Sequence, residues 1–290
     1  MEFAIYLTAG IANGSLYALM ALGLVLVYQT QNFVPFVNGE FFTAGAFLGF
    51  TAFRTLALPY ALSFGAAILC GALLGLITER VVIRPIARSH HLSLVLVTAG
   101  ASIALQGVAR ARWGDDIYTF PPIFAGQAVD VAGIPISLQN LTVVLVTASL
   151  SAVMFVFFAR TKLGKQMRAM SQSLAGAEII GINPVRVYRL TWALSGAVGA
   201  AAGVLAAPFM LLYPDMGGII LLKGFAAAVL GGLNSVAGAI LGGLAIGISE
   251  QLVGGYVGTV YIEISAFVVI IAVLLIRPQG LLGTSTVGRV

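Results

Sequence analysis

Long apolar stretches follow one another along the chain, and short polar segments separate them. An apolar helix needs roughly 20 residues to cross a lipid bilayer, and eight stretches approach or reach that length. They lie near residues 3–28, 41–58, 60–78, 93–109, 138–159, 190–212, 236–252 and 260–276. The pattern predicts an all-α polytopic membrane protein with about eight transmembrane helices, in which residues 1–290 form a single transmembrane domain.

A further apolar piece, residues 222–233, is too short to cross the membrane. At the helical rise per residue it reaches about 18 Å of a hydrocarbon core that is roughly 30 Å thick. The sequence GGLNS at 231–235 is a strong turn signal. We therefore expect a half-helix that enters the membrane and turns back, as in many transport pathways. The alternative is a glycine-rich seam between packed helices.

Basic residues collect in three polar regions, and these regions predict the orientation of the chain. They are the loop at 78–92, the passage at 160–189 and the tail after residue 276. Most of the 15 Lys and Arg residues lie there: Arg80, Arg84, Arg88, Arg160, Lys162, Lys165, Arg168, Arg186, Arg189, Arg277 and Arg289. Because basic residues are retained on the cytoplasmic side, we expect the N-terminus outside and the C-terminus in the cytoplasm.

Composition supports an integral membrane protein and excludes a soluble fold. Hydrophobic residues make up 60% of the chain, charged residues 9%, and the mean hydropathy is +1.04. A soluble domain carries roughly 25% charged residues. The cytoplasmic loops account for the net charge of +5, so no nucleic-acid partner is expected.

Three charged residues lie within or at the ends of apolar segments: Lys223, Glu250 and Glu263. A charge at the bilayer centre costs at least about 2.5 kcal/mol, so such groups usually have a partner. In the predicted topology all three lie at one level near the external face. We expect Lys223 to pair with Glu250 or Glu263 at the outer end of a translocation path. The alternative is that each side chain reaches the lipid headgroups without pairing.

The segment NFVPFVNGEFFTAGAF at 32–47 is a second candidate for the path. Pro35 and Gly39 interrupt the apolar pattern, Asn38 is suited to be an N-cap, and Glu40 falls in the first helical turn. Capping alone would explain these residues. The functional interpretation is a broken segment near the cytoplasmic mouth with Glu40 at its tip. The path candidates are Asn38, Gly39, Glu40, Lys223, Gly231, Gly232, Asn234, Glu250 and Glu263.

The passage at 164–190 is the most polar and basic part of the chain. From Lys165 to Ile180 the apolar residues Met167, Met170, Leu174 and Ala177 fall at helical spacing. Gly181 is a helix stop, and Asn183 with Pro184 predicts the start of the next helix. We expect a short cytoplasmic helix whose methionine face lies in a partner's groove. A loop helix that binds nothing is the alternative.

No recognisable catalytic chemistry is present in the sequence. It has no phosphate-binding G-x-x-x-x-G-K-[ST] motif, no metal-ligand spacing and no nucleophile with a base nearby. We expect no cofactor and no enzyme activity, so energy has to come from elsewhere. A secondary transporter or channel is the alternative, but it would carry acids deep in the bundle, whereas here they are expected near span ends.

Several separated stretches resemble the permease subunits of ABC importers for branched-chain amino acids, specifically the shorter of the two permease types. They are GSLYALMALGLVLVY (14–28), FVNGE (36–40), RPIARSHHLSLVLVTAGASIALQ (84–106), GKQMRAMSQSLAGAEIIGIN (164–183), KGFAAAVLGGLNSVAGAILGG (223–243) and RPQGLLG (277–283). The resemblance implies an inner-membrane subunit that forms half of a pathway for branched-chain amino acids, amides, urea or related small solutes. The implied partners are a second homologous permease, two cytoplasmic ATPase subunits and an extracytoplasmic solute-binding protein.

The resemblance also implies that residues 160–189 are the loop that couples the permease to its ATPases. The coupling candidates are Lys165, Met167, Arg168, Met170, Leu174, Ala177, Glu178 and Gly181. The general importer loop has a Glu before two alanines, and this Glu is missing from the stretch Ala175-Gly176-Ala177 that precedes Gly181. Arg168 and Glu178 are therefore the candidates for the main polar contact with an ATPase.

Overall fold

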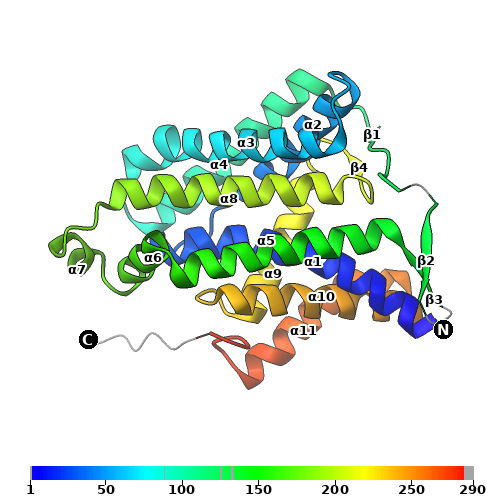
Figure 1. Ribbon diagram of the computed structural model, residues 1–290. Helices are drawn as coiled ribbons and strands as arrows, with labels where there is room; N and C mark the ends of the chain where they lie inside the picture. Colours follow the sequence, from blue (N-terminus) through cyan, green and yellow to red (C-terminus); the bar gives the residue numbers. More distant parts are fainter. Residues whose placement is uncertain (1, 88, 125, 132–133, 284–290) are drawn as a thin grey trace.

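The computed structural model describes residues 2–87, 89–124, 126–131 and 134–283, and most of this chain is helical (Figure 1). The helices are α1 Glu2–Gln31, α2 Asn38–Arg54, α3 Tyr60–Thr78, α4 His91–Trp113, α5 Leu138–Arg160, α6 Lys162–Gln172, α7 Leu174–Ile179, α8 Pro184–Ala206, α9 Met216–Gly231, α10 Val236–Tyr256 and α11 Ile262–Ile276. A π-helical turn, Glu79–Ile83, and a 3-10 turn, Arg84–Ile86, extend α3, and a 3-10 turn at Thr259–Tyr261 precedes α11.

Two small antiparallel strand pairs lie at one end of the bundle (Figure 1). Strand β1, Tyr118–Thr119, pairs with β4, Leu211–Leu212, so that Tyr118 lies opposite Leu212. Strand β2, Ala128–Val131, pairs with β3, Ile134–Ser137, in a hairpin. The strands lie in the segments that connect α4 to α5 and α8 to α9, and they do not form a separate domain.

Seven helices in the described chain are long and apolar enough to cross a membrane, which confirms the all-α polytopic fold. They are α1, α3 with its extension, α4, α5, α8, α10 and α11 with its preceding turn. Helices α2 and α9, with 17 and 16 residues, reach only about 26 and 24 Å of a roughly 30 Å core. The expected second span, 41–58, is therefore a short helix.

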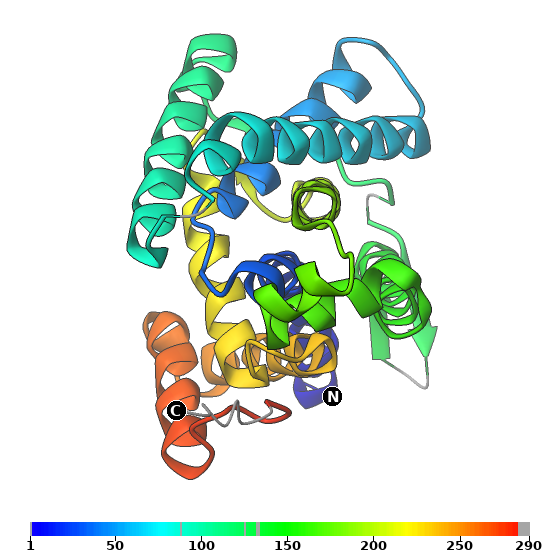
Figure 2. The same cartoon turned by 90° about the vertical axis from the view of Figure 1, so that its left-hand side faces the viewer.

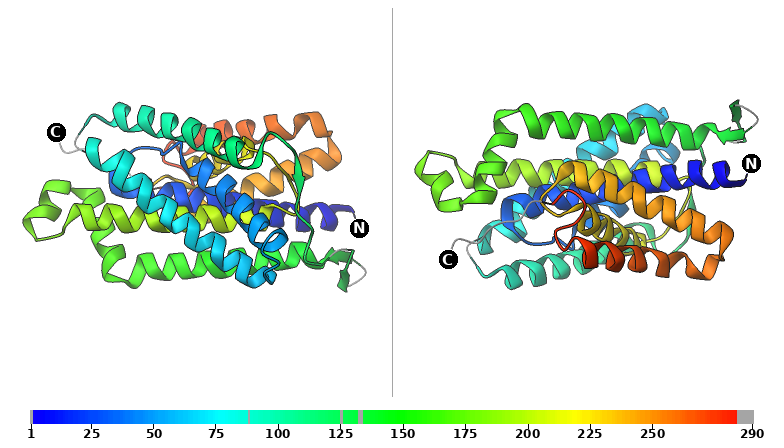
Figure 3. Two further views of the ribbon diagram at one scale, coloured as in Figure 1. Left: turned by 90° about the horizontal axis from the view of Figure 1, so that it is seen from above. Right: turned by 90° about the horizontal axis from the view of Figure 1, so that it is seen from below.

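Helix α1 lies at the centre of the bundle, where α5, α8, α9 and α10 pack around it (Figure 3). It is apolar on all sides, which is typical of a buried helix. Glycines bring it close to α10: a Cβ atom added at Gly247 would fall on the backbone of Gly14, and one added at Gly14 would meet Leu244. Such close contact between small residues holds membrane helices together.

The two short helices, α2 and α9, cross each other inside the bundle. A Cβ atom at Gly39 of α2 would lie 2.9 Å from the carbonyl oxygen of Gly217 in α9. Most residues of both helices are buried, and α9 also packs against α11 on a flank of the bundle (Figure 2). The crossing places the ends of two membrane-embedded helices close together.

The predicted turn at 231–235 is confirmed, and the tail of the chain completes it. Helix α9 ends at Gly231, Gly232 has a positive φ of 102°, and the Ser235 hydroxyl caps α10 by accepting from the amide of Gly238. The amides of Leu281 and Leu282 donate to the carbonyls of Leu230 and Gly231 at 2.8 and 3.0 Å. These bonds satisfy carbonyl groups that every helix end leaves free.

The basic regions meet at one end of the bundle. The extension of α3, helices α6 and α7, and the segment after α11 lie at the end opposite residue 2 (Figure 1). They carry Arg80, Arg84, Lys165 and Arg277, and Arg186 lies in the first turn of α8, which follows α7; Arg88 and Arg289 lie outside the described residues. The three basic regions thus lie on the same side of the bundle, as the positive-inside rule predicts for cytoplasmic segments.

Candidate functional site

Lys223 forms a charged cluster with residues from two other helices. Its Nζ atom lies 3.1 Å from Oε2 of Glu250 on α10. The hydroxyl of Tyr17 on α1 donates to the same oxygen at 2.8 Å and accepts from Lys223 Nζ at 3.2 Å. We call Lys223, Glu250 and Tyr17 the Lys223 cluster. No feature of the sequence pointed to Tyr17, because one tyrosine in an apolar run is unremarkable for a membrane helix.

The Lys223 cluster lies inside the bundle and not at its outer edge. Helix α9 begins at Met216, so Lys223 is in the middle of its helix, and the expectation that it lies near the external face is wrong. The side chain of Glu250 is 2% exposed and that of Lys223 is 20% exposed. Glu263 is exposed in the first turn of α11. In the described chain, Glu250 is the ion-pair partner of Lys223 and Glu263 is not.

Glu40 forms a second polar cluster within the bundle. Its Oε1 atom accepts from Ser102 Oγ and Gln106 Nε2 of α4, both at 2.8 Å. Ser102 lies near the middle of α4, so Glu40 is deep in the bundle, and the expectation that it sits at the cytoplasmic mouth is wrong. Ser102 and Gln106 are four residues apart on one face of a helix, and this spacing was the signal available in the sequence.

A crevice of about 170 Å³ opens beside Glu40 between α2, α3 and α4. Its lining includes Phe47, Leu74, Leu105 and Trp113, and it is mostly apolar. Both hydrogen bonds to Glu40 reach the same oxygen, Oε1, so its Oε2 atom takes part in neither. The crevice thus combines apolar surface with one carboxylate.

Asn38 links three helices and is not the helix cap that the sequence suggested. The cap position of α2 is Val37, and it makes no side-chain capping bond. The Asn38 amide instead donates to the Ser195 hydroxyl of α8 at 2.9 Å, and Ser195 donates to the Gly23 carbonyl of α1 at 2.8 Å. The buried chain of bonds fixes the start of α2 against α1 and α8.

The passage after α5 contains two helices, α6 and α7, where the sequence predicted one. The extended backbone of Ser173 ends α6. The Ser173 hydroxyl accepts from the amide of Gly176 and so caps the start of α7. The predicted stop and restart are confirmed: Gly181 has a φ of 83°, and the Asn183 side chain accepts from the amide of Arg186 at the start of α8.

The methionine face of α6 packs inward, which corrects its expected role in docking. Met167 is 0% exposed, and Met170 and Ala177 are also buried in the core of the bundle. Arg168 is likewise engaged within the chain, since it donates to the carbonyls of Phe158 and Ala159 at the end of α5. These side chains hold α6 and α7 to the bundle.

The outward surface of this passage carries the other coupling candidates. Lys165, Leu174, Glu178 and Gly181 are exposed. Ile179 and Ile180, which were not among the predicted coupling residues, are 85% and 72% exposed. We call the exposed surface of Lys165, Leu174, Glu178, Ile179 and Ile180 the α6–α7 patch.

Comparison with known proteins identifies the family. The family model described as branched-chain amino acid transport system / permease component matches residues 6–277. The chain belongs to this permease family. It is a permease subunit of an ABC importer and not an enzyme, because ATP hydrolysis belongs to separate ATPase subunits. It is a multi-pass protein of the bacterial inner membrane, and permeases of this kind work with ATPase and binding-protein partners.

Individual relatives match this permease over nearly their whole length. It is 33% identical to the high-affinity branched-chain amino acid transport system permease protein LivH of Escherichia coli, covering 97% of this chain and 96% of LivH. It is 32% identical to BraD of Pseudomonas aeruginosa, covering 98% and 97%. PsaBC from Streptococcus pneumoniae has a similar fold, with a TM-score of 0.51 at 16% identity over 94% of this chain and 92% of that chain.

Family membership, and not the position of the acids, argues against a secondary transporter or channel. The sequence predicted that the acids lie near span ends, which would be unusual for a secondary transporter or channel. Glu40 and Glu250 instead lie inside the bundle, so the position of the acids does not exclude that class of protein. Within the described residues, no group of three or more His, Cys, Asp and Glu is placed to hold a metal ion. The polar clusters are therefore best understood as parts of a permease.

Proposed function

We propose that this permease forms half of the translocation pathway of an ABC importer for branched-chain amino acids or related small polar solutes such as amides and urea. A second, homologous permease would form the other half, two cytoplasmic ATPase subunits would drive transport, and an extracytoplasmic solute-binding protein would deliver the substrate. The observation that carries the proposal is the full-length similarity to LivH and BraD, whose names specify branched-chain amino acids. Residues 1–290 act as one permease domain with the basic end in the cytoplasm.

The pathway is proposed to follow the two short helices. Helix α9 is too short to span the bilayer, yet one side of it exposes Ile219, Leu222 and Phe225. If lipid contacted this side, the hydrocarbon core of the bilayer would be thicker than the helix is long. A second permease would instead cover the exposed apolar side chains with protein. Lys223, partly exposed on the same helix, and Glu40, with one free oxygen, are the side chains best placed to meet a polar solute.

The other path candidates support these side chains in the proposal. Gly39 permits the crossing of α2 and α9, and Gly231, Gly232 and Asn234 form the turn at the basic end. The Gln29 amide of α1 holds this turn by donating to the Asn234 carbonyl at 2.7 Å. Glu263 would lie at the outer end, beside the start of α11.

Coupling to the ATPases is proposed to use the α6–α7 patch. Two large apolar side chains that are exposed at a polar end of a membrane protein favour a protein partner there. Gly181, Asn183 and Pro184 join α7 to α8 within a few residues, and α8 contacts α2 through Ser195 and Asn38. A displacement of the patch can thus reach the helix that carries Glu40.

Replacing both Ile179 and Ile180 with serine is expected to abolish ATPase association while the permease still folds. Both side chains are exposed, and exposed substitutions usually change stability by less than about 0.5 kcal/mol. The measurement is co-purification of the permease with its ATPase subunits after joint expression.

Val260→Ser is the matched control, because Val260 is 81% exposed in the turn before α11, away from the patch. It should retain the ATPases. Unchanged association of the double variant would refute the patch, and a wild-type complex without ATPase would refute the importer.

A further inference from the structure

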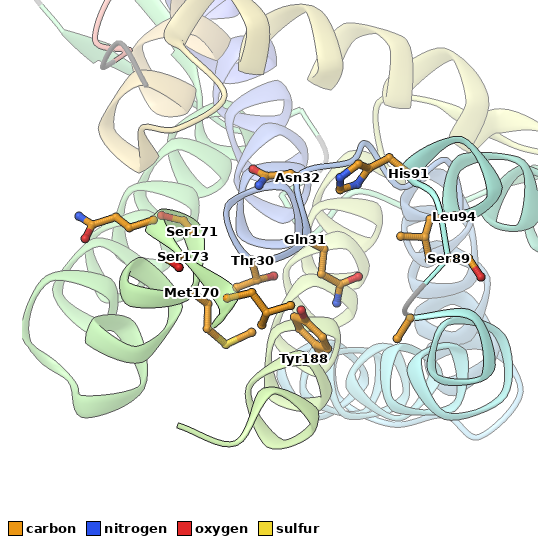
Figure 4. A pocket seen from close by; sticks show the side chains of 13 residues that line it. Thr30, Gln31, Asn32, Ser89, His91, Leu94, Met170, Ser171, Ser173 and Tyr188 are labelled. Carbon is orange, nitrogen blue, oxygen red and sulfur yellow. The ribbon is translucent and has the colours of Figure 1, made fainter. Parts of the chain in front are cut away.

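A polar cavity lies beside the coupling passage at the basic end of the bundle (Figure 4). Its volume is about 270 Å³, close to the lower limit of about 300 Å³ for small-molecule sites. The walls come from the end of α1, the start of α4, the junction of α6 and α7, and Tyr188 of α8. Neither the family match nor the proposed pathway assigns a role to this cavity.

Gln31 offers the cavity an unsatisfied hydrogen-bond donor. The residue is 9% exposed, and its Nε2 atom has no hydrogen-bond partner among the described residues. Figure 4 shows the side chain extending from the end of α1 toward Tyr188. Buried polar groups nearly always have a partner, so a ligand with an acceptor oxygen would satisfy this amide.

Two helix ends of opposite polarity line the same cavity. Thr30 and Gln31 form the carboxyl end of α1, whose dipole favours a cation, and Asn32 follows it; His91 and Leu94 belong to the amino end of α4, whose dipole favours an anion. The described lining contains no Asp, Glu, Lys or Arg; Arg88, between the lining residues Ala87 and Ser89, lies outside the described residues. A small molecule with one positive and one negative group and no net charge matches this arrangement.

We propose that the cavity binds a free zwitterionic amino acid from the cytoplasm and that its binding slows import. The ammonium group would face the backbone carbonyl groups at the end of α1, and the carboxylate would face the start of α4 and accept from the side-chain amide of Gln31. Met170 and Ser173 of the coupling passage form the opposite wall. A ligand that joins this passage to α1, α4 and α8 stabilises one arrangement of the coupling element over others.

The inference rests on the proposed function and on the cytoplasmic position of the basic end. The experiment uses the complete complex in proteoliposomes with ATP inside, and with binding protein and radiolabelled leucine outside. Unlabelled leucine in the lumen is expected to reduce the initial rate of import by about fivefold or more, as for typical coupling between sites. Lumenal 3-methylbutylamine, which lacks the carboxylate, and 4-methylpentanoate, which lacks the ammonium group, should have little effect.

Two variants of the cavity are expected to abolish the inhibition. Gln31→Leu removes the amide donor, and Ser89→Trp places an indole in the cavity from an exposed position, so the second does not depend on repacking the core. Thr55→Trp is the control. It adds the same side chain at an exposed site just after the carboxyl end of α2, and Thr55 does not line the cavity. It should be inhibited like the wild type.

The outcomes separate this inference from the proposed function. Inhibition of the wild type and Thr55→Trp but not of the cavity variants supports the site. Import that ignores lumenal leucine, equal inhibition of all variants, or equal inhibition by a singly charged analogue overturns it and leaves the importer intact. A complex with no ATP-driven leucine import even in an empty lumen would overturn the proposed function, and this inference with it.

Discussion

Glu250→Leu is expected to lower the free energy of unfolding by about 3–5 kcal/mol, because it leaves a buried charge without its partner. One carboxylate oxygen of Glu250 holds both the Lys223 ammonium and the Tyr17 hydroxyl. Lys223 lies in the middle of α9 with its side chain only 20% exposed, so its charge has little access to water. The measurement is thermal unfolding of the purified permease in lipid nanodiscs.

The double variant Lys223→Met, Glu250→Leu separates the structural role of the pair from its role in transport. Removing both charges of a buried pair is often neutral for stability, so this variant should unfold close to the wild type. If the pair lines the pathway, however, import should fall by about tenfold or more, which corresponds to about 1.4 kcal/mol or more in the barrier. Tyr17→Phe, the control, should cost less, about 1.5–3 kcal/mol of stability, because it removes one hydrogen bond to a charged group and leaves the ion pair in place.

Either of two results would contradict this interpretation of the Lys223 cluster. A double variant that is no more stable than Glu250→Leu would show that the two charges do not compensate each other. A stable double variant that imports at the wild-type rate would show that the pair supports the fold without contributing to the pathway.

Gly247→Val is expected to prevent close packing of α1 against α10 and to cause a large loss of folded protein. Even a single Cβ atom at Gly247 would fall on the backbone of Gly14 and lie 2.6 Å from the Gly10 carbonyl. Overpacking typically costs about 1–3 kcal/mol, and here backbone and not a flexible side chain would have to move. The yield of monodisperse permease and its thermal midpoint measure the effect.

Gly100→Val is the matched control, because Gly100 also lies within a long apolar helix, but beyond that helix's own neighbouring backbone no described atom is within 4 Å of its added Cβ atom. Its yield and midpoint should stay close to those of the wild type. Similar losses in both variants would mean that the effect comes from the helix backbone and not from the contact between α1 and α10.

Apolar run length and local stop signals made much of the fold predictable from the sequence. They located the seven long helices, the turn at 231–235 and the restart of α8 at Asn183 and Pro184. The predicted span 190–212 was wrong at its end, because α8 stops at Ala206 and residues 211–212 form β4. Helix α2 was misassigned as a span, because buried protein surface is as apolar as a surface that faces lipid. Hydropathy therefore cannot distinguish a short internal helix from a crossing one.

The composition of the candidate site was less predictable because it depends on contacts between distant segments. The sequence named Lys223 and Glu40 as unusual but could not choose Glu250 over Glu263, nor find Tyr17, Ser102 or Gln106 as partners. The amphipathic pattern around Met167 showed that α6 has an apolar face and a polar face. It could not show that the chain's own bundle covers the apolar face. The exposed Ile179 and Ile180 became visible only once that inward face was known.

The central claim is that this permease imports leucine-like solutes only when separate ATPases act on it. The most direct measurement is uptake of radiolabelled leucine into proteoliposomes that contain the complete complex, with binding protein outside. Accumulation of leucine is expected to require both hydrolysable ATP in the lumen and the binding protein outside. Uptake that persists without ATP, or that follows an imposed ion gradient, would contradict the account and support a secondary transporter.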